Sequence, residues 1–291
     1  MTRLLIIGYP VPASPSEAVQ RAALSAAGME VAIERWERKP HQLSEALGEV
    51  VDPGVLGAMI ASPHKERAAS LIGLLSDEAR ASGAVSVVTN RDGRLQGHNT
   101  DVAGVRAGLD ALVADGPGRW PRQAVVLGAG GGARAVVSVL LEKGLQRIAV
   151  FNRHLHRAEA LVAHFDRGAR ETDLRALPWH ETIIESELAK ARLVVNASGV
   201  GSEVDESPIP PALLPDDLFV LDLVLNQAQT PIMREAASRG GTVTNGQGSF
   251  LVAQAAAFEL WTGQAPTPDV MRAALAGHLG LPEKGPAVVG D

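Results

Sequence analysis

Short apolar runs alternate with longer amphipathic segments along most of this chain. An apolar run bounded by Gly, Pro or polar residues is typical of a buried strand, and apolar positions at helical spacing are typical of a helix that covers a sheet. The predicted strands are residues 4–8, 31–34, 55–60, 123–127, 147–151, 193–196, 219–223 and 242–243. This alternation predicts an α/β protein with parallel strands.

The amphipathic segments predict helices between the strands. Several carry start or stop signals, such as Gly28 after the first helix and Pro63 at the start of another. The predicted helices are residues 16–27, 63–75, 101–113, 132–143, 250–261 and 269–278, with a further amphipathic stretch at 41–48. Asp92-Gly93 predicts the turn of a short hairpin. The last two helices are apolar on one face and are expected to pack back across a domain junction.

The strongest local motif follows the strand at residues 123–127. There the chain runs from strand into helix through Gly128-x-Gly130-x-x-Ala133. Gly128 permits the tight turn, Gly130 lets the backbone approach a pyrophosphate, and the small Ala133 lets the helix pack closely. The helix then directs its unpaired N–H groups and positive dipole end at the phosphates. The motif therefore predicts a dinucleotide-binding unit.

The end of the second strand of this unit indicates which dinucleotide binds. An acid about 20 residues beyond the glycines would hold the free ribose 2′-hydroxyl of NAD. The chain has Asn152-Arg153 there, with Arg157 one helical turn later. A guanidinium group suits a phosphate, so these residues predict NADP. The alternative is that Arg153 is a solvated loop residue.

Two polar segments follow later strands of the same sheet, Asn196-Ala-Ser-Gly-Val-Gly201 and Asn245-Gly-Gln-Gly248. Open parallel sheets bind ligands at the carboxyl ends of their strands. These segments are therefore placed to touch nicotinamide, ribose or substrate. The alternative is that both are simple polar turns.

Composition narrows the class of protein. The chain has 291 residues, 46% of them hydrophobic and 21% charged. This size allows about two domains, each with a sizeable core. The formal charge of −6 disfavours a nucleic-acid partner, and the absence of cysteine excludes disulfides and thiolate catalysis. The eight histidines show no metal-binding spacing, so no metal is expected. No segment reads as a membrane span or secretory signal, so we expect a cytoplasmic protein without a membrane partner.

The first hundred residues hold candidate catalytic groups. Lys65 lies near a helix start, where its charge opposes the helix dipole at a cost of about a few tenths of a kcal/mol. Local helix energetics do not explain it, although a solvated surface lysine is the common case. Asp101 could be catalytic or could cap the helix that it begins. Ser14-x-x-Glu17 matches a capping box, so Ser14 and Ser16 could be helix-start residues only.

Ten blocks in order along the chain resemble the shikimate dehydrogenase family. They are Gly8-Tyr-Pro-Val-Pro-Ala-Ser14-Pro-Ser16, Pro63-His-Lys65, Ser82-Gly-Ala-Val85, Asp92-Gly-Arg-Leu-x-Gly97-x-Asn99-Thr100-Asp101, Gly128-Ala-Gly-Gly-Gly-Ala133, Asn152-Arg153, Asn196-Ala-Ser-Gly-Val-Gly201, Asp222-Leu-Val224, Thr230-Pro231 and Leu251-Val-x-Gln254-Ala255. The resemblance implies an N-terminal α/β substrate domain, residues 1–102 completed by C-terminal helices over 249–285. It also implies a Rossmann domain for NADP, residues 103–248, with the reaction in the cleft between the domains.

The resemblance further implies roles for individual residues. Lys65 and Asp101 become the catalytic dyad beside a secondary alcohol, whose oxidation needs a group that accepts the hydroxyl proton. The implied substrate-binding residues are Ser14, Ser16, Ser86 and Gln254, the first two at the substrate carboxylate. The implied cofactor-binding residues are Gly128, Ala129, Gly130, Gly131, Gly132, Ala133, Asn152, Arg153, Ala197, Ser198, Leu223 and Gly246.

Departures from the family pattern fall at contacts to the substrate ring. Family members usually have Asn-Val-Thr-x-Pro-x-Lys where this chain has Met59-Ile-Ala-Ser-Pro-His-Lys65, and Asn where it has Ser86. This chain has Leu225 where family members usually have Tyr, and Ala13 where they usually have His. Each lost partner leaves a substrate hydroxyl unpaired at about 1 to 3 kcal/mol. We therefore hypothesise hydride transfer between NADP and a cyclic hydroxy acid, either shikimate or a related compound with fewer or differently placed hydroxyls.

Two alternatives stay open. One is a catalytically weak regulatory paralogue that binds NADP and ligand without turnover. Retention of both Lys65 and Asp101 disfavours it, because a binder needs no proton-handling pair. The other is an NADP-dependent reductase that shares only the Rossmann half, which the match at Ser14 also disfavours. The sequence does not distinguish a monomer from a homodimer, or a role in aromatic amino acid biosynthesis from a catabolic one.

Overall fold

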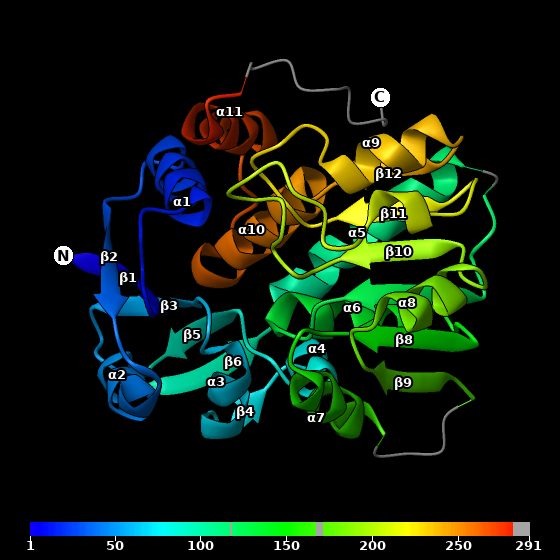
Figure 1. Cartoon of the computed structure of the whole chain (residues 1–291). Coiled ribbons are helices and arrows are strands. Elements are labelled where there is room, and N and C mark those ends of the chain that lie inside the picture. The colour runs from blue at the N-terminus through cyan, green and yellow to red at the C-terminus, as the bar shows by residue number, and fades with distance from the viewer. Residues whose placement is uncertain (117, 167–170, 282–291) are drawn as a thin grey trace. The chain divides into compact units, whose positions relative to one another are not determined.

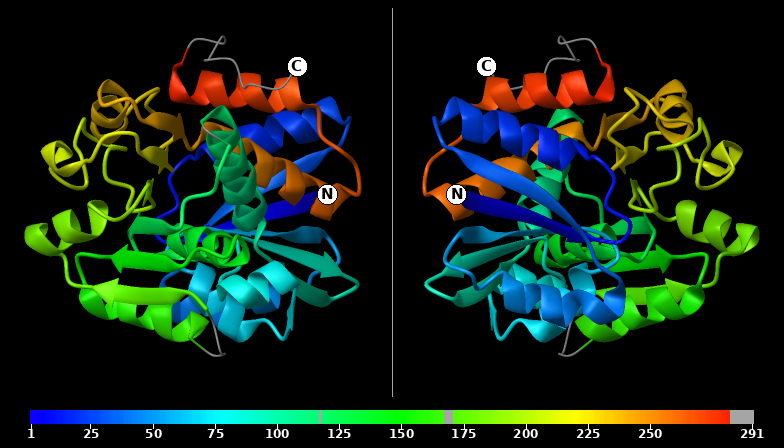
Figure 2. Two further views of the ribbon diagram at one scale, coloured as in Figure 1. Left: turned by 90° about the vertical axis from the view of Figure 1, so that its right-hand side faces the viewer. Right: turned by 90° about the vertical axis from the view of Figure 1, so that its left-hand side faces the viewer.

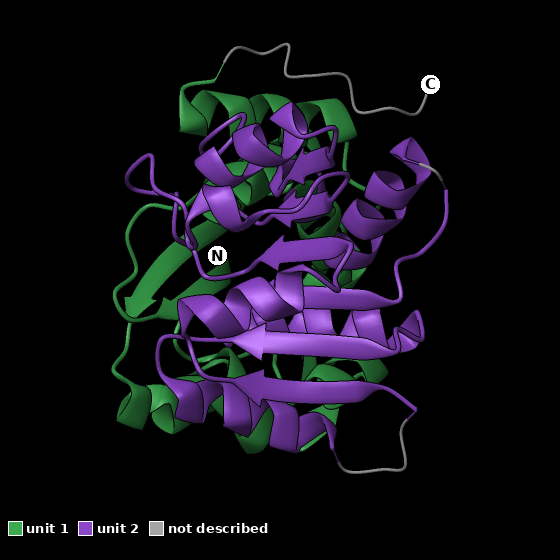
Figure 3. Ribbon diagram, turned by 45° about the vertical axis from the view of Figure 1, so that its right-hand side comes forward, with its two compact units in different colours: residues 1–103, 251–287 green, residues 104–250, 288–291 purple. Residues whose placement is uncertain are grey.

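The computed structural model describes residues 1–116, 118–166 and 171–281. The chain forms two compact units, shown in Figure 3. Unit 1 comprises Met1–Ala103 and the described residues from Leu251 onward, and unit 2 comprises Gly104–Phe250. Each unit has its own six-stranded sheet with helices, which confirms the predicted α/β class. The predicted end of the C-terminal helices, residue 285, lies outside the described residues.

The sheet of unit 1 has the strand order β2-β1-β3-β5-β6-β4 (Figure 1). Its strands are β1 (Thr2–Gly8), β2 (Val31–Glu37), β3 (Val55–Ile60), β4 (Leu74–Leu75), β5 (Val87–Arg91) and β6 (Arg94–His98). β1 pairs in parallel with β2 and β3, whereas β5 is antiparallel to β3 and β6. The central strands β1 and β3 are mostly buried, because helices cover both faces of the sheet.

Helices cover the sheet of unit 1. They are α1 (Pro15–Ala26), α2 (Leu43–Glu49), α3 (Lys65–Leu71), α4 (Asp77–Ser82), α11 (Pro268–Leu279) and the C-terminal part of α10 (Gln247–Thr262). Leu47, Ala68 and Ala79 of α2, α3 and α4 join one buried cluster with the strands. α1 and α11 lie side by side, as both views in Figure 2 show. On α10, Trp261 Nε1 donates to the carbonyl oxygen of Val88 in β5 at 3.0 Å.

The predicted helix over residues 63–75 is wrong in its last four residues. α3 ends at Leu71, and Leu74–Leu75 pair with β6 as the short strand β4. A further helix that the sequence analysis missed, α4, begins after Ser76, whose hydroxyl accepts the Ala79 N–H at 3.2 Å. A long-range strand pairing and a local helix cap together outweigh the apolar periodicity of the segment.

The predicted hairpin turn is confirmed between β5 and β6. Asp92 and Gly93 both have positive φ, 52° and 79°, as a type I′ turn requires. The side-chain oxygen of Asn90 accepts the Gly93 N–H at 2.9 Å and closes the turn. Local turn chemistry therefore sets the register of β5 against β6.

Unit 2 has a fully parallel sheet with the strand order β12-β11-β10-β7-β8-β9. Its strands are β7 (Gln123–Leu127), β8 (Arg147–Phe151), β9 (Asp173–Leu177), β10 (Leu193–Asn196), β11 (Phe219–Asp222) and β12 (Thr242–Asn245). This is the order of a doubly wound dinucleotide-binding sheet, whose direction switches between β7 and β10. The predicted Rossmann-type unit is confirmed, and β9 is a strand that the sequence analysis did not identify.

Helices connect these parallel strands. Those between successive strands are α6 (Gly131–Glu142), α7 (Leu155–Phe165), α8 (Glu181–Leu188) and α9 (Pro231–Ser238), while α5 (Thr100–Asp115) leads into β7 and the N-terminal part of α10 follows β12. Buried residues of α8 and α9, such as Leu188 and Met233, pack with Val194 and Val220 of the sheet. Within the described residues, no helix combines the length and the apolar character needed to cross a bilayer.

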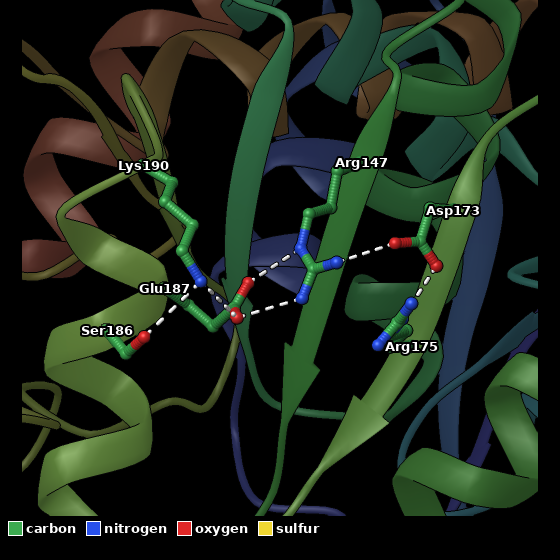
Figure 4. A network of polar contacts seen from close by, with 6 residues as sticks. All are labelled: Arg147, Asp173, Arg175, Ser186, Glu187 and Lys190. Carbon is green, nitrogen blue, oxygen red and sulfur yellow. Dashed lines mark hydrogen bonds and ion pairs between the residues drawn. The ribbon is translucent and has the colours of Figure 1, made fainter.

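At the amino-terminal ends of β8 and β9, a charged network joins the sheet to α8 (Figure 4). Arg147 donates to both carboxylate oxygens of Glu187, each at 2.8 Å, and to Asp173 at 2.6 Å. Arg175 and Lys190 extend the network. The Glu187 side chain is only 8% exposed. Hydrogen bonds from Arg147 are the main reason that the pKa of Glu187 lies below its ordinary value.

Arg147→Leu is expected to lower the free energy of unfolding by about 1 to 3 kcal/mol at neutral pH, because it leaves the buried Glu187 carboxylate short of donors. A carboxyl with a lowered folded-state pKa contributes stability that is present above its unfolded-state pKa and is lost as the pH falls through the folded-state value. The stability difference between variant and wild type should therefore shrink below about pH 4. Urea unfolding at several pH values measures this. Arg175→Leu, at a side chain 56% exposed, is the control; a difference for Arg147→Leu that does not change with pH would contradict the prediction.

Candidate active site

Lys65 and Asp101, the predicted dyad, are in direct contact within unit 1. Lys65 Nζ lies 2.5 Å from Asp101 Oδ2, and their side chains are 25% and 23% exposed. Lys65 is the first residue of α3, and Asp101 is the second residue of α5. The carboxylate compensates the ammonium group at the unfavourable end of the α3 dipole. Because the pair stays partly accessible, it can hold a hydroxyl group and take up its proton.

Backbone contacts fix the start of α3 and therefore the position of Lys65. The fully buried His64 ring has its Nε2 2.6 Å from the carbonyl oxygen of Arg38. The His64 N–H donates to the Ala61 carbonyl at 3.0 Å. The Val85 N–H donates to the carbonyl oxygen of Lys65 itself at 2.9 Å. The lysine is thus presented from a segment tied to two other parts of unit 1.

Asp101 is held by the turn that leads from β6 into α5. Asn99 Oδ1 accepts the Asp101 N–H at 3.2 Å, while Asn99 Nδ2 donates to Ser82 Oγ at 2.8 Å. Ser86 Oγ accepts the Thr100 N–H at 2.9 Å and lies 3.1 Å from the Thr100 hydroxyl. Ser86, which we expected to contact substrate, is 7% exposed. Its hydroxyl serves the start of α5, a use that the sequence analysis did not foresee.

Ser14 and Ser16 lie at the start of α1. Ser14 is the N-cap residue, and its Oγ accepts the Glu17 N–H at 3.3 Å, so the helix-capping interpretation is confirmed. Ser16 is partly buried in the first turn. Within the described residues, neither hydroxyl bonds to Lys65 or Asp101. Their contact with a substrate carboxylate stays a prediction.

Gln254, the predicted substrate residue of α10, is 9% exposed and belongs to unit 1. Gln20 Nε2 donates to the Gln254 carbonyl oxygen at 2.8 Å and to Gln254 Oε1 at 3.0 Å. Because Gln254 Oε1 is the acceptor here, its amide nitrogen is turned away and can donate elsewhere. Gln20, which is fully buried on α1, was not predicted from the sequence. A single amide on an amphipathic helix gave no distinctive signal.

The predicted phosphate-binding loop has the geometry that its glycines imply. Gly128 has φ +114°, and a Cβ there would lie 2.6 Å from the Ala197 carbonyl oxygen. Gly130 precedes α6 without a side-chain cap, and a Cβ there would meet nothing within 4 Å. Ala133 is fully buried. The open N-terminus of this 12-residue helix fits a pyrophosphate group.

Asn152 and Arg153 directly follow β8, as predicted. The side chain of Asn152 donates to the His154 carbonyl oxygen at 2.9 Å and fixes the turn into α7. The Arg153 side chain is exposed. Its guanidinium group is therefore available to a phosphate at the carboxyl edge of the sheet.

Three neighbouring strands of unit 2 end in the same kind of turn. The register aligns Asn196, Asp222 and Asn245 at the ends of β10, β11 and β12. In each turn, a side-chain oxygen accepts the backbone N–H of the residue two positions later at 3.1 Å. These Asx turns form the edge at which parallel sheets bind their ligands.

The remaining predicted cofactor residues lie in these turns. Ala197 faces the glycine loop through the close contact at Gly128 described above. Ser198 Oγ donates to Asn196 Oδ1 at 2.6 Å. A Cβ on Gly246 would lie 2.6 Å from the carbonyl oxygen of Leu223. The turns are thus packed backbone to backbone, and unit 2 brings together the cofactor residues that the resemblance implied.

Asp222 lies in one of the family-like blocks, but no role was predicted for it; the structure makes it a candidate functional residue. It is fully buried. Its Oδ1 accepts hydrogen bonds from Asn196 Nδ2 at 2.9 Å and from the Val224 N–H at 3.1 Å, and its Oδ2 accepts one from the Thr230 hydroxyl at 2.6 Å. Burial raises the pKa of Asp222, and the three hydrogen bonds oppose this shift. The sequence signal that could have identified Asp222 is an acidic residue at the end of an apolar strand.

The described part of the chain contains no group of three His, Asp or Glu side chains placed to hold a metal ion.

Comparison with known proteins places these features in a family. The model "Shikimate dehydrogenase substrate binding domain" matches residues 6–88, and the model "Shikimate / quinate 5-dehydrogenase" matches residues 118–205. The chain is 40% identical over 283 residues to a shikimate dehydrogenase (NADP(+)) of Thermus thermophilus, and the match covers 97% of this chain and 100% of that protein.

Solved structures agree with this comparison. Shikimate 5-dehydrogenase from another strain of Thermus thermophilus, in complex with NADP(H) and shikimate, is 35% identical with a TM-score of 0.77, and the match covers 95% of this chain and 99% of that one. Quinate dehydrogenase of Corynebacterium glutamicum, in complex with NAD, is 27% identical with a TM-score of 0.82 over 95% of this chain and 99% of that one. With identity of this level over nearly the whole length, the chain belongs to the shikimate dehydrogenase family.

Proposed function

We propose that this protein catalyses reversible, NADP-dependent oxidation of the secondary alcohol of shikimate or a related cyclic hydroxy acid. The observation that carries the proposal is the contact between Lys65 Nζ and Asp101 Oδ2 in a chain of this family. A regulatory paralogue that only binds its ligands has no use for a proton-handling pair, so the intact pair favours the enzyme. If shikimate is the substrate, the reaction belongs to the shikimate pathway.

The dyad has a defined task in such a reaction. Oxidation of the alcohol removes a hydride from carbon and a proton from oxygen, and NADP supplies the hydride acceptor when it is bound. Lys65 orients the hydroxyl group and stabilises the negative charge that develops on its oxygen. The hydroxyl proton is accepted by a carboxylate oxygen of Asp101, because Lys65 as an ammonium group has no free electron pair for it. Asp101 holds the ammonium group in place through the 2.5 Å contact.

The proposal assigns one role to each unit. Unit 1 takes the substrate, with Ser14 and Ser16 at its carboxylate and the amide nitrogen of Gln254 at a hydroxyl. Unit 2 takes NADP. The cofactor residues are Gly128, Ala129, Gly130, Gly131, Gly132, Ala133, Asn152, Arg153, Ala197, Ser198, Leu223 and Gly246. The open N-terminus of α6 and the exposed guanidinium of Arg153 support this assignment.

The proposal includes an altered preference among hydroxy acids. Met59, at a position where the family usually has Asn, is buried and offers only a thioether. Ser86 has its hydroxyl engaged with Thr100. Leu225, where a Tyr is usual, has no side-chain donor. Fewer polar partners at the ring favour substrates with fewer or differently placed hydroxyls, at about 1 to 3 kcal/mol per unpaired group.

Steady-state kinetics on a substrate panel tests both the proposed dehydrogenase activity and the altered substrate preference. Shikimate, quinate and simpler cyclic hydroxy acids are each measured with NADP⁺ and NAD⁺. We expect turnover with NADP⁺ and a higher kcat/KM for a substrate other than shikimate. A kcat/KM for shikimate typical of an efficient biosynthetic enzyme would refute the altered preference but support the dehydrogenase. Absence of turnover with every hydroxy acid would contradict the proposed function.

Arg153→Asp is expected to shift the ratio of kcat/KM for NADP⁺ over NAD⁺ toward NAD⁺ by roughly thirtyfold, because it replaces a charge-assisted hydrogen bond to the 2′-phosphate by repulsion. Arg119→Asp makes the same charge change at another exposed position of unit 2 and serves as the control. An unchanged ratio in Arg153→Asp would remove Arg153 from the cofactor site.

A further inference from the structure

Asp222 places a buried carboxyl group where its hydrogen bonds do not require an acid. Its carboxylate accepts from Asn196, Val224 and Thr230, all of them neutral donors. Within the described residues, no ion pair includes Asp222, and the side chain is fully buried. Burying a carboxylate without a cation nearby is unfavourable, and burial raises the pKa of Asp222 accordingly.

An asparagine at this position would satisfy the same partners. Two of the three hydrogen bonds meet at Oδ1, which an amide oxygen would accept equally well. The third joins Oδ2 to the Thr230 hydroxyl, and that hydroxyl can accept from an amide nitrogen instead. Moreover, the neighbouring strands β10 and β12 make the same Asx turn with Asn196 and Asn245. The turn therefore explains an amide or an acid, but not the charge.

The position of this charge within the sheet indicates what it acts on. A doubly wound sheet consists of two mononucleotide-binding halves, one on each side of the switch point. The half with β7, β8 and β9 carries the glycine loop and Arg153, so it faces the pyrophosphate and the adenosine end of NADP. Asp222 lies at the carboxyl end of β11 in the other half, which faces the nicotinamide end.

The nicotinamide ring carries a positive charge in NADP⁺ and none in NADPH. We propose that the buried carboxylate of Asp222 stabilises the cationic nicotinamide ring and so makes the protein bind NADP⁺ more tightly, relative to NADPH, than the same fold with a neutral side chain would. The proposal rests on the proposed function, because it requires a nicotinamide cofactor in unit 2. The charge would then favour the oxidised cofactor over the reduced one, because the neutral ring of NADPH has no comparable attraction to the carboxylate.

Equilibrium binding tests the proposal without reference to turnover. The dissociation constants for NADP⁺ and for NADPH are measured by calorimetric titration of the wild type, Asp222→Asn and Asp216→Asn. Asp216 is exposed in the loop before β11, so its replacement removes the same charge at the opposite end of that strand.

In Asp222→Asn, we expect the ratio of the dissociation constant for NADP⁺ to that for NADPH to rise roughly tenfold, because loss of one unit charge weakens binding of the cationic ring only. Asp216→Asn should leave the ratio as in the wild type. The melting temperature of Asp222→Asn should equal or exceed that of the wild type, because the turn is kept and a buried charge is removed.

Thr230→Val separates the charge from the position of the turn. This substitution keeps the Asp222 carboxylate but removes the 2.6 Å hydrogen bond to it. It should weaken the binding of NADP⁺ and NADPH by the same factor and leave their ratio unchanged.

The outcomes distinguish the inference from the function on which it rests. Binding of both nucleotides with an unchanged ratio in Asp222→Asn would overturn the inference and leave the proposed function intact. An Asp222→Asn protein that does not fold would show that the charge is structural and would also overturn the inference. A wild-type protein that binds neither NADP⁺ nor NADPH would overturn both.

Discussion

Replacement of Lys65 by alanine is expected to lower kcat by about a thousandfold, within the range that positioned acid–base groups contribute. The variant lacks the group that orients the alcohol and stabilises its developing negative charge. The dissociation constant for NADP⁺ should stay close to that of the wild type, since Lys65 belongs to unit 1 and the predicted cofactor residues belong to unit 2. Steady-state kinetics and calorimetric titration with NADP⁺ measure the two quantities.

Arg67→Ala is the matched control for this prediction. Arg67 is an exposed cation on the same helix, α3, two positions from Lys65. Its replacement should leave kcat within about twofold of the wild type, because it removes charge without touching the ion pair. If Lys65→Ala retained a kcat like that of Arg67→Ala, the dyad would have no part in the chemistry.

Replacement of Gly57 by alanine is expected to destabilise unit 1 by about 3 kcal/mol or more. A Cβ at Gly57 would lie 2.0 Å from the Val88 carbonyl oxygen and 2.7 Å from Trp261 Nε1. These two atoms are the acceptor and donor of the 3.0 Å hydrogen bond between β5 and α10. The added methyl group would therefore displace the helix that also carries Gln254. Urea unfolding and thermal melting measure the effect.

Gly48→Ala is the same chemical change, but we expect it to have the opposite effect on the free energy of unfolding. Gly48 lies within α2, and a Cβ there would meet nothing within 4 Å. Alanine at this position should raise the free energy of unfolding by about 0.5 to 1 kcal/mol, because it restricts the unfolded chain and favours the helix. Equal stability of the Gly57→Ala and wild-type proteins would show that β5 and α10 can separate at no cost.

The Asp92-Gly93 turn and the glycine loop were predictable because their structure depends on neighbouring residues. A type I′ turn needs two residues with positive φ, and a phosphate-binding loop needs glycine where a Cβ would clash. Both requirements are visible as residue types at fixed spacing. The angles at Asp92 and Gly93 and the close approach of Gly128 to Ala197 agree with them.

The helix prediction over residues 63–75 failed because the structure of this segment depends on residues far away in the chain. The apolar residues near Leu74 match a helical period locally, but the structure pairs them with β6, more than twenty residues away. Ser76 then starts a new helix by capping the Ala79 N–H. Periodicity alone cannot distinguish a longer helix from a helix followed by a short strand.

The sequence by itself determined most of the strands, the phosphate-binding loop and the residue types of the ion pair, because these depend on periodicity and on chemistry at short range. Only the tertiary structure decided that Lys65 and Asp101 touch, that the Ser86 hydroxyl supports α5, and that Asn196, Asp222 and Asn245 align at one edge. These contacts join residues far apart in the chain through strand register and helix packing, which no local pattern encodes.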